Sequence, residues 1–155
     1  MTRLLRAQPA FDWLHAARHY FAVLLVAHPI WEIAQLPLYT IWHSATLPQM
    51  AFAVAHCTAG DLLIGMSTLL LSVILVGNPG WPQRRFVRVA LATVAIGVAY
   101  TIYSEWLNVD VRGAWAYAPA MPRLPWLGTG LAPFAQWLVI PALAFWRLAR
   151  LRRAV

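Results

Sequence analysis

The sequence predicts an all-α integral membrane protein, a single bundle of four membrane-spanning helices, on two observations: composition and segment length. Hydrophobic residues make up 61% of the 155-residue chain and charged residues only 11%, whereas about a quarter of the residues in a soluble domain are charged. Four apolar segments each approach the length of about 20 residues that a helix needs to cross the hydrocarbon core of a bilayer. No charged linker divides the chain, so we expect one domain.

The predicted spans follow the four apolar segments in order. They cover residues 20–39, 48–76, 86–107 and 133–146. Between the second and third spans lies GNPGWPQRR, whose Pro and Gly residues predict a turn. Residues 1–18 contain Asp12, His15 and Arg18, which interrupt any signal-peptide core and predict a short amphipathic helix on the membrane surface. We therefore expect the first span to remain in the mature protein.

The arginine distribution predicts the orientation of the bundle. The net charge is +7, and all 12 basic residues are Arg. Only Arg112 and Arg123 fall between the third and fourth spans; the other ten flank the opposite ends of the spans. The positive-inside rule then places both termini in the cytoplasm and the loops 40–47 and 108–132 outside, which fits a bacterial inner membrane. Such clusters indicate contact with anionic lipid headgroups and no role in nucleic-acid binding.

The outer loop at residues 108–132 is long and aromatic. Pro and Gly residues interrupt it, yet it contains Trp115 and Tyr117. Loops of this length without secondary structure are often functional. Two interpretations are open: a cap over the outer mouth of the bundle, with Trp115 and Tyr117 contacting a ligand, or an aromatic anchor at the membrane interface.

Three acidic residues carry the strongest functional signal in the sequence. Glu32, Asp61 and Glu105 fall within, or at the outer ends of, three different predicted spans. The predicted topology puts all three in the outer half of the membrane. Ionisable residues inside a membrane are costly and nearly always face the bundle interior, where they mark functional sites.

Helical spacing groups further polar residues with these acids. The groups are His28, Glu32, Gln35 and Tyr39 on the first span; His56, Cys57 and Asp61 on the second; Thr101, Glu105 and Asn108 on the third; and Gln136 and Trp137 on the fourth. Directed inward, they predict an outer-facing pocket for a ligand. The spacing shared by Glu32–Gln35 and Glu105–Asn108 also allows a two-fold internal repeat.

Each of these residues also has a purely structural interpretation. Glu32 and Glu105 can be neutral acids whose hydrogen bonds hold helices together. Asp61 follows Gly60, which allows close helix approach. His28 can bond a backbone carbonyl that Pro29 leaves free.

The pattern resembles the EXPERA group of four-helix membrane proteins, which includes the emopamil-binding sterol isomerase and the sigma-2 receptor. The matching segments are HPIWE with His28 and Glu32, HCTAGDLL with Asp61, YTIYSEWLN with Glu105, and QWLVIP with Gln136 and Trp137. The sequence departs from the isomerases where Asp61 replaces a longer Glu and Gln136 replaces an Asn.

The resemblance implies a pocket that binds or isomerises a sterol-like or isoprenoid lipid, or binds an amphiphilic cation. Double-bond isomerisation passes through a carbocation, which carboxylates and Trp faces stabilise. In that chemistry Glu32, paired with His28, would donate a proton, and Glu105 would accept one or stabilise the cation.

Two other classes of function are open. A transition-metal or haem site would draw on carboxylate, imidazole and thiolate ligands at one depth of the bundle. Its candidates are His28, Glu32, His56, Cys57, Asp61 and Glu105, with Met50, His56 and Cys57 as a copper set. The third class is an accessory subunit of a larger membrane complex, and a homodimer is a further assembly open to a chain of this size. Otherwise we expect membrane lipids and a small hydrophobic or amphiphilic ligand as partners and no resident cofactor.

Overall fold

The computed structural model describes residues 12–153, and every regular element in this part of the chain is a helix. The elements are α1 (Trp13–Gln35), η1 (Leu36–Leu38), α2 (Ile41–Ser44), α3 (Leu47–Val76), α4 (Phe86–Glu105), η2 (Trp106–Val111) and α5 (Leu131–Arg153). Four of the described helical segments are long and apolar enough to cross a membrane: α1 with η1, α3, α4 with η2, and α5. The prediction of an all-α membrane protein with four spanning helices is therefore confirmed.

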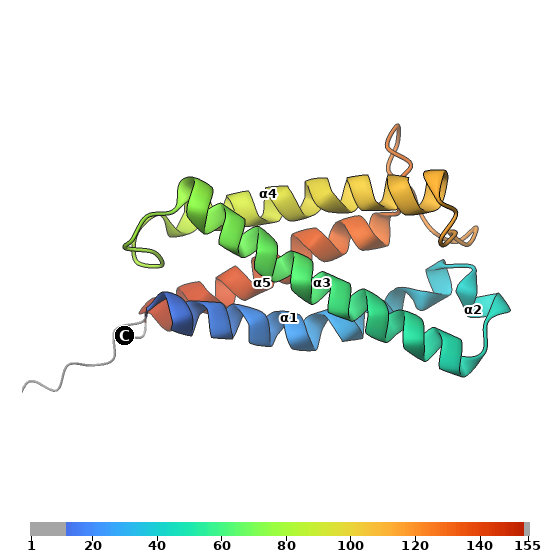
Figure 1. Ribbon diagram of the computed structural model, residues 1–155, viewed down its shortest axis with the longest axis horizontal. Helices are drawn as coiled ribbons and strands as arrows, with labels where there is room; N and C mark the ends of the chain where they lie inside the picture. Colours follow the sequence, from blue (N-terminus) through green and yellow to red (C-terminus); the bar gives the residue numbers. More distant parts are fainter. Residues whose placement is uncertain (1–11, 154–155) are drawn as a thin grey trace, which may run out of the picture.

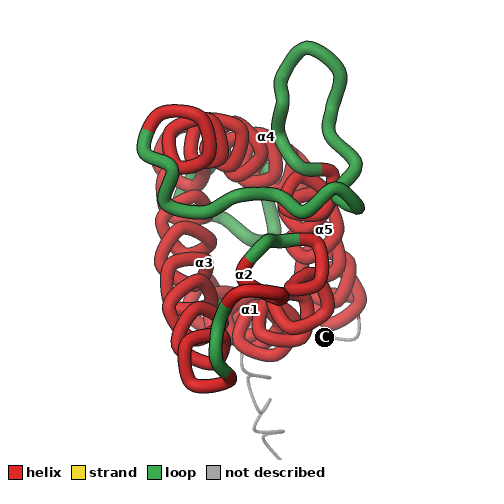
Figure 2. The backbone as a smooth tube through the Cα atoms, turned by 90° about the vertical axis from the view of Figure 1, so that its right-hand side faces the viewer, coloured by secondary structure: helices red, strands yellow, loops and turns green. Residues whose placement is uncertain are grey.

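The four long helices surround a common axis (Figures 1 and 2). α1 packs against α3 and α5, and α4 packs against the same two helices. The start of α1, the connection between α3 and α4, and the end of α5 lie together at one end of the bundle, on the left of Figure 1. We call this the arginine end; its described arginines are Arg18, Arg84, Arg85, Arg88, Arg147, Arg150, Arg152 and Arg153. The opposite end, with α2 and residues 112–130, is the loop end.

Local signals in the sequence set where the helices begin. The Asp12 side chain accepts a hydrogen bond from the His15 backbone N–H at 2.8 Å and caps α1. At the start of α3, the Gln49 side chain accepts from the Thr46 N–H at 2.8 Å, in a capping box. Arg85 has a φ of 56°, in the left-handed region, which turns the chain just before α4.

The apolar core occupies the arginine half of the bundle. It contains Tyr20 and Leu24 of α1, Val89 of α4, and Ile140 and Leu148 of α5, all at most 2% exposed. The buried ionisable side chains Glu32 and Glu105 lie instead on the loop half. A mainly apolar half thus supports a half that contains the polar site.

Three helices are longer than the predicted spans. Residues 13–18 continue α1, so they do not form a separate surface helix; the rest of that predicted helix lies outside the described residues. Residues 106–111 extend the third helix as a π-helix, and α5 runs to Arg153. Hydropathy underestimates α1 and α5 because arginine side chains can extend past an apolar helix surface while the backbone stays helical.

Candidate acidic pocket at the loop end

A cavity of about 1060 Å³ lies at the loop end, between the four long helices and residues 113–116. This volume is at the upper end of the range for ligand pockets. Its polar lining includes Glu32, Gln35, His56, Cys57, Asp61, Thr101, Ser104, Glu105 and Gln136, and its apolar and aromatic lining includes Leu36, Tyr39, Ile41, Phe52, Ile64, Tyr100, Trp115, Pro133 and Trp137. We call it the acidic pocket, because it brings together the three carboxylates predicted to share one depth.

One glutamine amide joins three of the four helices on one side of the pocket. Nε2 of Gln136 on α5 lies 3.0 Å from Glu32 Oε1 of α1 and 2.9 Å from Asp61 Oδ2 of α3. It also lies 2.9 Å from Nδ1 of His28, which is itself 3.2 Å from Asp61 Oδ2. Gln35 adds a second amide, which donates to Glu32 Oε1 at 2.9 Å. These five side chains form what we call the acid–amide cluster.

Counting hydrogens indicates how the acid–amide cluster is bonded. A glutamine Nε2 has two hydrogens, and both are used if Gln136 donates to Glu32 and to Asp61. His28 Nδ1 lies 2.9 Å from the Gln136 amide nitrogen and 3.2 Å from Asp61 Oδ2, and its Nε2 is buried without a partner. The cluster therefore holds two carboxyl groups and one imidazole around a single amide nitrogen, in a site where His28 is 0% exposed.

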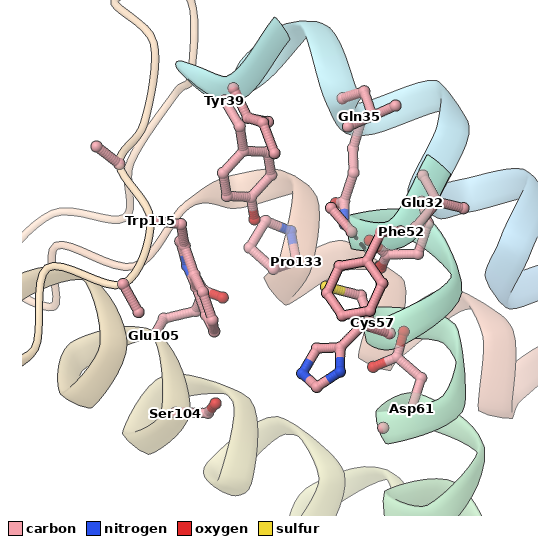
Figure 3. A pocket seen from close by; sticks show the side chains of 18 of the residues that line it. Glu32, Gln35, Tyr39, Phe52, Cys57, Asp61, Ser104, Glu105, Trp115 and Pro133 are labelled. Atoms are coloured by element: carbon pink, nitrogen blue, oxygen red, sulfur yellow. Dashed lines mark hydrogen bonds between the residues drawn. The ribbon is translucent and has the colours of Figure 1, made fainter. Parts of the chain in front are cut away.

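Glu105 lies on the opposite side of the pocket from Glu32 and Asp61 (Figure 3). The Tyr117 hydroxyl donates to its Oε2 and accepts from the Gly130 backbone N–H at 2.9 Å. Burial and then the bond to Glu105 raise the pKa of the Tyr117 hydroxyl, so it stays a neutral donor. The Trp115 ring lies beside Glu105 in Figure 3, with its buried N–H making no hydrogen bond of normal geometry.

Residues 113–118, which we call the strap, cross the loop end of the pocket. The Thr40 N–H donates to the Ala116 carbonyl at 3.0 Å, and the Ala118 N–H donates to the Leu38 carbonyl at 2.9 Å. The rings of Tyr39 and Tyr117 are 5.5 Å apart, and burial, with the charge of Glu105, raises the pKa of Tyr39. The strap thus joins the segment after α1 to the Glu105 side of the pocket.

Most of the predicted site residues meet at this pocket, and the exceptions have structural reasons. Thr101 lines the pocket with its hydroxyl buried and unpartnered, and His56 lines it while stacking on Phe52 at 5.8 Å. His28 and Tyr117 lie behind the wall, in contact with residues that line it.

Asn108 is the residue that the structure separates from the predicted group. Its amide donates to the Ser104 carbonyl at 2.9 Å, and it does not line the pocket. The π-helix at residues 106–111 changes the helical phase after Glu105, so the spacing argument fails there. Gln35 bonds to Glu32 whereas Asn108 does not bond to Glu105, so the two motifs proposed as a repeat differ in their contacts.

Sequence reasoning missed the apolar walls and one glycine. Phe52, Ile64 and Tyr100 line the pocket, but in an apolar chain nothing distinguished them from residues that face lipid. Gly97 packs against Trp137. A glycine in the middle of the third span was the available signal for it.

The donor geometry does not favour the metal hypothesis. Within residues 12–153, no group of three or more His, Cys, Asp or Glu side chains is arranged to hold a metal ion. In the acid–amide cluster, the Gln136 amide nitrogen occupies the position between the carboxylates and His28.

Comparison of the chain with protein families, with curated proteins and with solved structures finds no match. The EXPERA resemblance therefore stays a prediction.

Proposed function

We propose that this protein binds an amphiphilic ligand with a positively charged or hydrogen-bond-donating group in the acidic pocket, within the membrane. The proposal rests on one observation: three carboxylates from three helices surround one cavity whose remaining walls are largely apolar and aromatic. No described residue that lines it is an arginine. An anionic headgroup would meet uncompensated repulsion there, whereas a cation would gain from the carboxylates and from the aromatic faces.

A second candidate, double-bond isomerisation of a sterol-like or isoprenoid lipid, is favoured by the acid–amide cluster and by the EXPERA resemblance. A protonated carboxyl group of Glu32 or Asp61 would give its proton to one alkene carbon, leaving a carbocation. A base on the ligand's other side, such as Glu105, would take a proton from a neighbouring carbon, so the double bond moves and composition is unchanged. Buried carboxyl groups close to one imidazole support this chemistry.

We also propose a bacterial inner membrane location with the arginine end in the cytoplasm. Eight of the ten arginines within residues 12–153 belong to segments at that end, as the positive-inside rule requires. The acidic pocket then opens in the outer half of the bilayer, and the strap covers its outer end.

The native thiol of Cys57 offers a direct test, because it lines the pocket and is the only cysteine. Its reaction rate with cationic trimethylammonioethyl methanethiosulfonate is compared with that of anionic sulfonatoethyl methanethiosulfonate. The ratio of the two rates cancels the reactivity of the thiol itself. We expect the ratio of the cationic to the anionic rate to exceed that of a free thiol by about tenfold. An electrostatic interaction of about 1.4 kcal/mol with one nearby carboxylate would produce this factor.

Variants assign the effect to the pocket. The double variant Glu32→Gln/Asp61→Asn should lower the rate ratio at least about fivefold. Asp110→Asn removes an exposed carboxylate that does not line the pocket and should leave the ratio unchanged. Equal relative rates for both reagents in the unmodified protein would refute a cation-binding pocket. Elemental analysis of the same sample tests the metal hypothesis, which requires about one bound ion per chain.

A further inference from the structure

The indole ring of Trp137 closes the pocket on the side of the arginine end. Trp137 is 3% exposed and belongs to the pocket wall. Its ring centroid lies 5.5 Å from that of His28, so the ring also supports the acid–amide cluster. Its neighbour Gln136 supplies the amide that joins Glu32 and Asp61.

Two glycines on neighbouring helices border this ring, and one of them, Gly97, leaves the space that the ring occupies. A Cβ atom at Gly97 of α4 would lie 2.5 Å from Cε3 and 3.1 Å from Cζ3 of Trp137. A Cβ atom at Gly65 of α3 would lie 3.9 Å from Cη2 of the same ring and 2.3 Å from Cδ2 of Leu24. Carbon atoms pack at about 3.5–4.0 Å, so the ring fits in this position only because residue 97 has no side chain.

The ring sits at the level where the pocket ends. The deepest wall residues are Ile64 on α3 and Tyr100 on α4. Toward the arginine end, Gly65 follows Ile64 directly and Gly97 lies about one helical turn from Tyr100, and neither glycine lines the cavity. Leu24, which contacts the Gly65 position, already belongs to the apolar core.

We propose that Trp137, seated between Gly97 and Gly65, is the floor of the acidic pocket and sets how deep the apolar part of a ligand can enter. The depth limit for a ligand rests on the proposed binding function, whereas the position of the floor does not. A larger residue at 97 pushes the ring about 1 Å toward the pocket. A small residue at 137 opens the pocket toward Leu24.

The floor is tested first without any ligand. In a Cys57→Ala background, Leu24→Cys places one thiol just beyond the ring. The cationic methanethiosulfonate reagent should label it at least about tenfold faster when Trp137→Ala is added than when Trp137 is present. Equal labelling with and without the indole ring would overturn the proposal, because the reagent would then pass Trp137 freely.

The depth limit is tested with alkyltrimethylammonium ions of 8 to 16 carbons, in phosphatidylcholine nanodiscs, through their protection of Cys57 from alkylation. Consider the longest ion that protects Cys57 in the protein with Gly97. Gly97→Ala should weaken the binding of that ion about fourfold, which is the effect of one methylene that no longer fits. Trp137→Ala should admit longer chains. In a Trp137→Leu background, Gly97→Ala should have no effect, since it acts only through the indole ring.

The outcomes separate the two proposals. A chain-length limit that is the same in all variants would overturn the depth limit, even with binding intact. If no chain protects Cys57 but Leu24→Cys is still shielded by Trp137, the binding function fails and the floor stands.

Discussion

At the scale of single residues, Gln136 decides the chemistry of the acid–amide cluster. Its Nε2 is the one amide nitrogen of the cluster that bonds both Glu32 and Asp61, and the residue is 2% exposed. A buried acceptor that loses its donor costs about 1–3 kcal/mol, and more if it is charged. The amide therefore stabilises two acids that would otherwise repel each other.

Gln136→Leu should lower the free energy of unfolding by about 2–4 kcal/mol, because it removes that donor from the buried Glu32 and the partly buried Asp61. Unfolding in mixed detergent micelles measures the loss. Gln35→Leu is the matched control, since it removes one bond, to Glu32 alone, and should cost about half as much. Equal costs for the two variants would show that Gln136 does not join the two acids.

At the scale of elements, the strap depends on one side chain and a few backbone bonds. Tyr117 is 6% exposed and connects Glu105 to the Gly130 backbone. The backbone bonds of Thr40 and Ala118 connect the strap to the segment that follows α1. The short segment is thus held at both sides of the pocket mouth.

Tyr117→Phe keeps the ring but removes the hydroxyl that bonds Glu105 and Gly130. We expect amide hydrogen exchange in residues 113–118 to accelerate at least about fivefold, as a local loss of about 1 kcal/mol or more implies. Tyr103→Phe changes the same chemical group at a 54% exposed position and should not alter exchange in the strap. Unchanged exchange in Tyr117→Phe would mean that the backbone bonds alone hold the strap.

At the scale of the whole molecule, the two halves of the bundle have opposite character. The arginine half has an apolar core and a rim of basic side chains, and the loop half has the acidic pocket. In Figure 1 the chain termini of the described segment and the α3–α4 connection share the arginine end. The proposed orientation in the membrane rests on this polarity.

Thiol labelling tests that orientation. In a Cys57→Ala background, Ser44→Cys in α2 should react with a membrane-impermeant maleimide in intact spheroplasts. Gln83→Cys, in the exposed connection between α3 and α4, should react only after the membrane is permeabilised. The reverse pattern would invert the topology and place the acidic pocket in the cytoplasmic leaflet.

Sequence patterns were sufficient for the features that depend on local chemistry. Span number follows from apolar length, and the burial of Glu32 and Glu105 follows from the cost of a charge in lipid. Helical period was enough to group His28, Glu32 and Gln35, because α1 keeps its phase through Gln35. The same period failed at Asn108, where a π-helix changes that phase.

What the sequence by itself determined is therefore a four-helix membrane bundle with buried acids toward one end. Only the tertiary structure decided which groups meet: that Gln136 bonds two of the acids, that Tyr117 bonds the third, and that Gly97 makes room for Trp137. The physical reason is that spacing along a helix fixes which side chains share a face. Contacts between helices depend on packing and on loops, where residues far apart in the sequence come within 3 Å.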